Sequence, residues 1–334
     1  MFAKRTTLGI LMMGLAAAAA AQIEPGGFAR ETAKDYRELA RYPESSRVLK
    51  RGEEDPIRAK RLPTRQSMPG PDGSEPILSV WTAKISFEVG QPIDLFATLE
   101  TRAKAVRPDS ISGEIADASG AIVAQVTYKD DGQEADRTAG DGVWSARLAM
   151  PKGLEPSPAA SYMVRVKARL ADGDLRDGAG GFLYSRPSAH LTGRYRDLLR
   201  DGNLVVAAEV DVKEAGRFHL AGTLATAEGE PIGTAQSAAH LEPGRYWIEL
   251  SYYGLMFHDR KAAGPYRLAS LALSTTNVMP NAQNDLVENV HLTRAYRTGQ
   301  MTERPFQEPR LLETAKRLEL DADRTQGRTA PEQQ

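Results

Sequence analysis

Short apolar runs alternate with turn residues along the chain from about residue 76 onward. The clearest run is 162–170, where apolar and polar residues alternate as in a strand with one buried face. Short strands joined by short turns over 76–187 predict an immunoglobulin-like β-sandwich. Its strands are expected at 77–81, 85–89, 93–99, 110–116, 121–128, 143–148, 162–170 and 182–184.

A second block of the same kind runs from Asp201 to about Tyr296, after a linker that we place at 187–195, and we bound the second domain at 188–297. Its apolar runs are separated by Gly-containing turns, which predicts a second β-sandwich that is either immunoglobulin-like or jelly-roll-like. Its strands are expected at 204–212, 216–225, 246–253, 266–274 and 286–296. The expected fold class is therefore all-β, with two tandem β-sandwich domains.

The two ends of the chain lack this pattern. Residues 22–75 are polar, with prolines at 25, 43, 56, 63, 69 and 71, so we expect a flexible lead segment. An arm that wraps one of the domains is the alternative. A short helix is expected at 35–40. The tail 298–334 is also polar, and 310–320 predicts a short amphipathic helix.

The first 21 residues have the pattern of a secretory signal peptide. Lys4 and Arg5 precede the apolar run 8–15, and an alanine run that ends at Ala21 offers a cleavage site. A membrane anchor is the competing interpretation, but the apolar run is short for a span. We therefore expect a periplasmic or secreted protein without a transmembrane segment after cleavage.

The composition excludes several kinds of chemistry. The chain has no Cys, which rules out disulfides, zinc thiolates and cysteine nucleophiles. The formal net charge is −1 and the basic residues are not clustered, so nucleic acid is not an expected partner. The five His lie far apart, and neither a His-Glu-x-x-His motif nor a Gly-x-Ser-x-Gly elbow is present.

The loop between the expected strands 121–128 and 143–148 is the densest concentration of one chemistry. Asp130, Asp131, Asp136 and Asp141 supply hard oxygen ligands on one short segment rich in Gly, which predicts a calcium site. A polar hairpin turn with Asp-Gly corners is the alternative. The sequence does not favour a regulatory calcium ion over a structural one.

Aromatic residues suggest a second candidate site. Trp247 and Tyr253 share one face of the expected strand 246–253, and flat aromatic faces bind sugars. These two side chains are the expected ligand platform. In the alternative, the lead or tail segment covers Trp247.

The acidic hairpin also resembles a known family. Its motifs, Asp130-Asp131-Gly132 and the run 140–146, are similar to a hairpin signature of the bacterial exported proteins called choice-of-anchor X. Further matching stretches lie at 191–197, 201–206, 257–260 and 264–266, so the resemblance covers roughly 76–296. It implies immunoglobulin-like sandwiches at the cell surface or in the periplasm and supports a calcium ion in the hairpin.

These observations predict an exported, non-catalytic protein of the cell envelope that binds or scaffolds a protein or glycan. The alternative is a secreted hydrolase, or an accessory subunit of one, that acts on polysaccharide or peptidoglycan. That activity needs two opposed carboxyl groups in a cleft, expected near 190–195.

Overall fold

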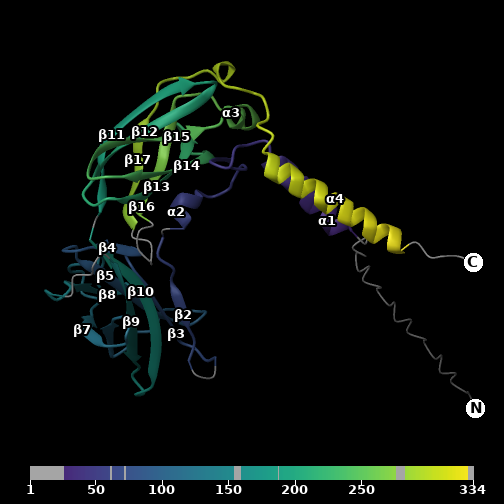
Figure 1. Ribbon diagram of the computed structural model, residues 1–334. Helices are drawn as coiled ribbons and strands as arrows, with labels where there is room; N and C mark the ends of the chain where they lie inside the picture. Colours follow the sequence, from purple (N-terminus) through teal and green to yellow (C-terminus); the bar gives the residue numbers. More distant parts are fainter. Residues whose placement is uncertain are drawn as a thin grey trace, which may run out of the picture. The chain divides into compact units, whose positions relative to one another are not determined.

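The computed structural model describes residues 26–60, 62–70, 73–153, 159–186, 188–275 and 283–329. The fold is all-β, as the sequence predicts, with four sheets and few helices (Figure 1). The chain divides into two compact units. One is a pair of helices made from the two chain ends, and the other spans Tyr42–Phe306 and contains all the sheets.

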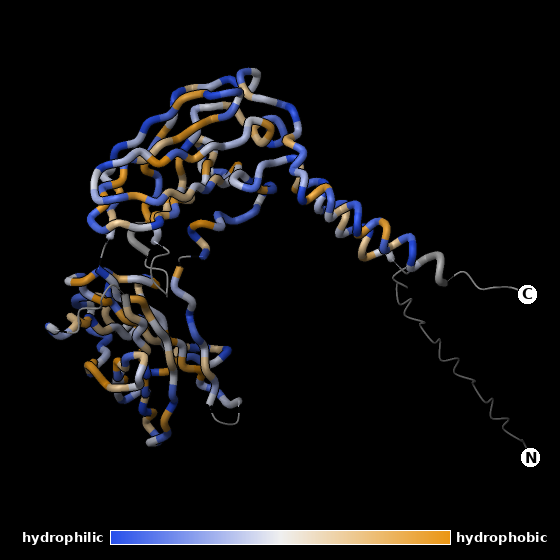
Figure 2. The backbone as a smooth tube through the Cα atoms, in the orientation of Figure 1, coloured by the Kyte–Doolittle hydropathy of each residue, from blue (hydrophilic) through white to orange (hydrophobic). Residues whose placement is uncertain are grey.

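The first sandwich consists of a five-stranded sheet, β4-β10-β9-β6-β7, and a four-stranded sheet, β2-β3-β5-β8. Alternation along the strands creates its core: in β9, Val164 and Val166 are buried, whereas Arg165 and Lys167 are exposed. Figure 2 shows the same mixture of apolar and polar positions along the backbone of both sandwiches. The strands are β2 (Gln66–Met68), β3 (Ile77–Thr82), β4 (Ser86–Glu88), β5 (Ile93–Glu100), β6 (Ser110–Ala116), β7 (Ile122–Tyr128), β8 (Trp144–Leu148), β9 (Ala159–Arg169) and β10 (Leu175–Ser185).

The second sandwich consists of a five-stranded sheet, β1-β14-β13-β16-β17, and a three-stranded sheet, β11-β12-β15. Its core contains the inward residues of both sheets, among them Val206, Leu220, Leu250 and Leu271. The elements are β1 (Ser46–Val48), β11 (Ala189–Arg200), β12 (Asn203–Val212), β13 (Gly216–Thr226), β14 (Pro231–Leu241), β15 (Gly244–Tyr252), α3 (Leu255–Arg260), β16 (Tyr266–Thr275), β17 (Gln283–Leu292) and the 3-10 helix η1 (Thr298–Gln300).

The expected linker at 187–195 is wrong. Strand β11 begins at Ala189 and continues to Arg200, antiparallel to β12. A bulge between Leu191 and Tyr195 interrupts the pairing, and Gly193 within it has a φ of 81°. The bulge and the polar residues of β11 conceal the alternation that would otherwise have predicted a strand.

The lead segment 22–75 is also not one flexible stretch in its described part. Strand β1 pairs with β14 of the second sandwich, and β2 pairs with β3 of the first. Between them lies a short helix, α2 (Pro56–Ala59), capped by Asp55, which accepts hydrogen bonds from two backbone N–H groups. The alternative of an arm therefore describes this segment better, because β1 and β2 each add a strand to a sheet, one in each sandwich.

The helix pair consists of α1 (Gly27–Leu39) and α4 (Pro309–Thr329), which lie side by side (Figure 1). Both are longer than the helices predicted at 35–40 and 310–320. Ala33, Ala315 and Ala322 are fully buried, so small side chains let the two helices approach closely. Arg37 forms two hydrogen bonds to Glu319, at 2.9 and 2.6 Å, on the exposed side of the pair.

The expected signal peptide, residues 1–21, lies outside the described residues. Among the helices that the structure describes, none combines the length and the apolar character that a membrane span requires.

Candidate functional site

The acidic loop joins β7 to β8 at one end of the first sandwich. Its base is closed by one pair of backbone hydrogen bonds, from Lys129 N to Ser145 O at 2.8 Å and from Ser145 N to Lys129 O at 2.7 Å. The loop is thus the tip of a hairpin whose two strands belong to different sheets. The sequence prediction of a hairpin tip is confirmed by this pairing.

Asp130, at the start of the loop, forms hydrogen bonds with the backbone near the end of the loop. One carboxylate oxygen accepts a hydrogen bond from Gly140 N at 2.7 Å, and the other accepts one from Gly142 N at 3.3 Å. Both glycines have a positive φ, 75° and 84°, which side chains disfavour. Asp141, between them, accepts a hydrogen bond from Val143 N at 2.8 Å. The Gly residues thus direct backbone donors at the acidic side chains.

Asp136 lies at the centre of the loop and is only 7% exposed. Its carboxylate accepts hydrogen bonds from Gly132 N at 2.6 Å and from Thr138 N at 3.0 Å. Ligand oxygens of Asp130, Asp136 and Asp141 all lie within 4.8 Å of one another. Within the described part of the chain, these three carboxylates form no ion pair, and backbone N–H groups offset part of their mutual repulsion.

The residues present fit a calcium ion. Calcium takes oxygen ligands in irregular geometry, and a carboxylate oxygen that accepts one hydrogen bond keeps a second lone pair for a cation. Asp131, the fourth predicted ligand, is not in the cluster. Its carboxylate accepts a hydrogen bond from Gln133 N at 3.1 Å and lies 3.9 Å from Lys129 Nζ. The loop therefore divides its carboxylates into a cluster of three and a separate Asp131.

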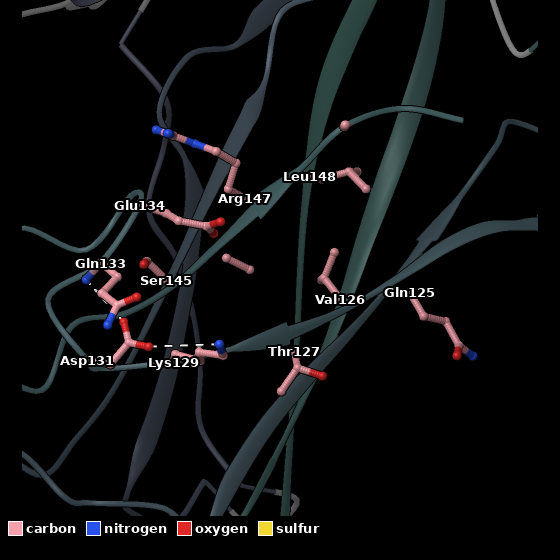
Figure 3. Close-up of a pocket in the computed structure, with 12 residues that line it drawn as sticks. Gln125, Val126, Thr127, Lys129, Asp131, Gln133, Glu134, Ser145, Arg147 and Leu148 are labelled. Atoms are coloured by element: carbon pink, nitrogen blue, oxygen red, sulfur yellow. Dashed lines mark hydrogen bonds and ion pairs between the residues drawn. The ribbon is translucent and has the colours of Figure 1, made fainter. Parts of the chain in front are cut away.

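A groove of about 340 Å³ opens between β7 and β8 beside the loop (Figure 3). It is lined by residues 125–127 of β7, by residues 145–148 of β8 with the following Ala149, and by loop side chains that include Asp131 and Glu134. We call it the edge groove, because each of its walls is the edge strand of a sheet. The sequence analysis did not predict it, since the divergence of two strands after a hairpin is a tertiary feature.

The two residues of the expected aromatic platform have different surroundings. Trp247 lies on β15, with the guanidinium carbon of Arg196 4.4 Å from its ring centroid. Tyr253 follows the end of β15 and makes edge-on ring contacts with Tyr42, at 6.3 Å, and with Phe306, at 5.9 Å. Residues of the lead segment and of the tail thus contact Tyr253, whereas an arginine stacks on Trp247.

The expected hydrolytic region near 190–195 contains one buried carboxylate. Glu209 is 6% exposed, and it accepts hydrogen bonds from Thr192 Oγ1 at 2.9 Å and from Arg194 at 3.2 Å. Both donors come from the bulge of β11. This carboxylate therefore holds the bulge in place.

A second cluster of polar side chains fastens the edge of the second sandwich. Asp197 on β11 accepts hydrogen bonds from Tyr296 OH at 2.6 Å, His291 Nε2 at 2.8 Å and Arg294 Nε at 3.2 Å. Burial raises the pKa of Asp197, but these hydrogen bonds outweigh burial and leave the pKa below its usual value. No sequence signal predicts this cluster, because Asp197 lies more than ninety residues before the three residues that donate to it.

Comparison with known proteins gives a partial family match. Residues 188–288 match the family model described as "Domain of unknown function (DUF4785) C-terminal domain". The resemblance to choice-of-anchor X is therefore wrong, because the family match is to a different domain. No curated protein matches the chain.

Two solved structures are similar to the chain at low identity. One is a DUF4785 family protein from Legionella pneumophila subsp. pneumophila str. Philadelphia 1, with 18% identity and a TM-score of 0.46. That match covers 68% of this chain, which spans 58% of the length of the Legionella chain. The other is CopC from Methylosinus trichosporium OB3b, with 22% identity, a TM-score of 0.20 and coverage of 30% of this chain and 82% of that one.

Proposed function

We propose that this is an exported, non-catalytic β-sandwich protein of the cell envelope that binds or scaffolds a protein or glycan, with a structural calcium ion in its first sandwich. The observation that carries the proposal is the convergence of Asp130, Asp136 and Asp141 at the hairpin tip. A cation there would neutralise carboxylates that no described ion pair reaches. The N-terminal pattern at 1–21 supports export.

A binding role fits the polar side chains that the structure describes. The carboxylates of the loop, Glu209 and Asp197 all accept hydrogen bonds that hold local structure in place. Loop ends and sheet edges are the surfaces that β-sandwich proteins offer to partners. A calcium ion at the hairpin tip would fix the loop beside the edge groove, and so would stiffen one such surface.

Thermal unfolding with calcium and with a chelator tests the ion. A ligand that binds only the native state adds about 4 kcal/mol to the free energy of unfolding at a thousandfold excess over its Kd. We expect calcium to raise the Tm of the wild type clearly and to raise the Tm of Asp141→Asn much less. Asp131→Asn is the matched control, because Asp131 is also exposed and also accepts one hydrogen bond from the backbone N–H two residues ahead.

The variants separate a calcium site from general screening of acidic charge. If an ion binds at the cluster of three carboxylates, calcium should raise the Tm of the Asp131→Asn protein as much as that of the wild type. Equal shifts in all three proteins would mean that calcium acts on the loop's overall charge. If calcium changes the Tm of none of them, the loop binds no calcium and is a turn that its own hydrogen bonds stabilise.

A further inference from the structure

Strands β7 and β8 separate immediately after the base of the acidic hairpin. Lys129 and Ser145 exchange two backbone hydrogen bonds, and beyond them each strand continues in a different sheet, β7 beside β6 and β8 beside β5. The edge groove occupies the opening between them (Figure 3). A backbone ladder therefore begins at this point and stops after one pair of residues.

Both walls of the edge groove present unpaired backbone groups. Successive residues of a strand direct their N–H and C=O groups to opposite sides. Since Lys129 points these groups toward Ser145, those of Thr127 and Gln125 point the same way, away from β6. By the same alternation, the groups of Arg147 point into the groove. None of these three residues has a described backbone partner on that side.

The floor of the edge groove is apolar. Ala146 and Leu148 of β8 belong to the first core, and Val126 of β7 packs against that core while remaining partly exposed. Outward from the floor, Gln125 and Thr127 are exposed. A strand that entered the groove would therefore place alternate side chains on an apolar floor and in solvent.

The end of the groove beside the acidic loop carries negative charge. Asp131 and Glu134 line it together with Lys129. Arg147 also lines it, but its guanidinium is paired with the Asp94 carboxylate at 2.7 and 2.9 Å. The charge of Glu134 also acts on the Arg147 guanidinium, so two cations, Lys129 and Arg147, face three anions, Asp94, Asp131 and Glu134, beside the three carboxylates of the loop cluster.

We infer that the edge groove binds an extended peptide segment of a partner protein by strand addition, a segment that alternates apolar and basic side chains. Its backbone would pair with Gln125 and Thr127 of β7 or with Arg147 of β8. The apolar side chains would cover Val126, and the basic ones would face Asp131 and Glu134. This inference rests on the proposed binding role and specifies the partner class and the site.

Charge complementarity favours such a peptide over a second copy of this chain. The exposed edge of β7, residues 122–128, has the sequence Ile-Val-Ala-Gln-Val-Thr-Tyr and contains no basic side chain. Pairing of two β7 edges would therefore leave the acidic end of each groove without a counter-charge. A basic peptide supplies that charge together with the missing strand.

Fluorescence anisotropy with a labelled Lys-Val-Lys-Val-Lys-Val-Lys peptide tests the inference on the mature full-length protein. The decisive variant is Thr127→Pro, which removes a backbone N–H directed into the groove and leaves the β6 ladder intact. Thr127→Val is the matched control, because it changes the side chain and keeps the N–H. We expect Thr127→Pro to weaken binding about tenfold relative to Thr127→Val, with a similar Tm for both variants.

Two further measurements complete the test. We expect the Glu-Val-Glu-Val-Glu-Val-Glu peptide not to bind, and we expect binding of the basic peptide to slow hydrogen exchange in residues 122–128. Equal affinity of the two Thr127 variants, or equal binding of the two peptides, would overturn the inference. Concentration-dependent dimerisation that Thr127→Pro abolishes would assign the groove to a second copy instead.

Repeating the titration in calcium and in chelator keeps this inference separate from the proposed ion. Peptide binding without any thermal shift by calcium would leave the groove assignment standing and refute the metal site. If calcium raises the Tm only of the proteins that retain Asp141 and no peptide binds, the groove assignment is refuted and the metal site stands.

Discussion

Asp197 shows how a single buried side chain makes stability depend on pH. Its side chain is 7% exposed and receives hydrogen bonds from Tyr296, His291 and Arg294. These bonds favour the ionised form, so the pKa is lower in the folded chain than in the unfolded one. The resulting stabilisation is present above the unfolded pKa and is lost as the pH falls through the folded pKa.

Replacing Asp197 by Asn should therefore lower the free energy of unfolding at neutral pH by about 1–3 kcal/mol, because the largely buried Tyr296 and His291 lose a charged acceptor. The difference from the wild type should shrink as the pH falls below about 4, where the wild-type carboxyl also becomes protonated. Urea unfolding followed by Trp fluorescence over a pH series measures both effects. Asp211→Asn is the control: Asp211 forms an exposed pair with Lys213, so a much smaller effect is expected.

At the scale of elements, residues 42–48 of the lead segment are part of the second sandwich. Tyr42, four residues before the start of β1, is 5% exposed and belongs to the second core. Its hydroxyl donates a hydrogen bond to Asp259 of α3 at 2.5 Å. Ser46 of β1 accepts a hydrogen bond from the backbone N–H of Tyr253 at 2.9 Å. These contacts fix the segment by both side chain and backbone.

Tyr42→Ala should destabilise the second sandwich by about 3 kcal/mol, because it removes a buried aromatic ring and leaves a cavity. Tyr42→Phe keeps the ring and loses only the hydrogen bond to Asp259, so a cost of about 1 kcal/mol is expected. Chemical denaturation of both variants measures the difference. If Tyr42→Ala unfolds at the same urea concentration as the wild type, the lead segment contributes nothing to that core.

The sequence predicts strands well where alternation is strong and poorly where it is weak. The expected strands 110–116 and 77–81 agree closely with β6 and β3. Strand β14 was missed because Pro231–Leu241 consists mostly of small and polar residues. The pairing of α1 with α4, and of β1 with β14, depends on contacts between distant residues, which no local pattern reveals.

The candidate site was also predictable only in part, namely where a local stretch of sequence reveals it. Residue types alone identified the acidic loop, since carboxylates and glycines are dense there. The separation of Asp131 from the other three carboxylates depends on which backbone N–H each one accepts. The edge groove depends on β7 and β8 joining different sheets, which is a property of the assembled sandwich.

At the scale of the molecule, the segment that matches the family model omits elements that complete the second sandwich. Residues 188–288 contain neither β1 nor Tyr42, and without β1 the edge of β14 is unpaired. A fragment of residues 188–306 should therefore melt at a lower temperature than a fragment of residues 42–306. Adding a peptide of residues 42–60 to the shorter fragment should restore part of the difference. Equal melting temperatures of the two fragments would contradict this account.

The closure of the fold by its two chain ends has a consequence for the timing of synthesis. Ser46 and its partner Tyr253 are 207 residues apart, and Arg30 of α1 and its partner Asp323 of α4 are 293 residues apart. At translation rates of about 5–20 residues per second, α1 waits roughly 15–60 seconds for its partner helix. During that interval α1 has no partner helix, so the helix pair can form only after α4 has been synthesised.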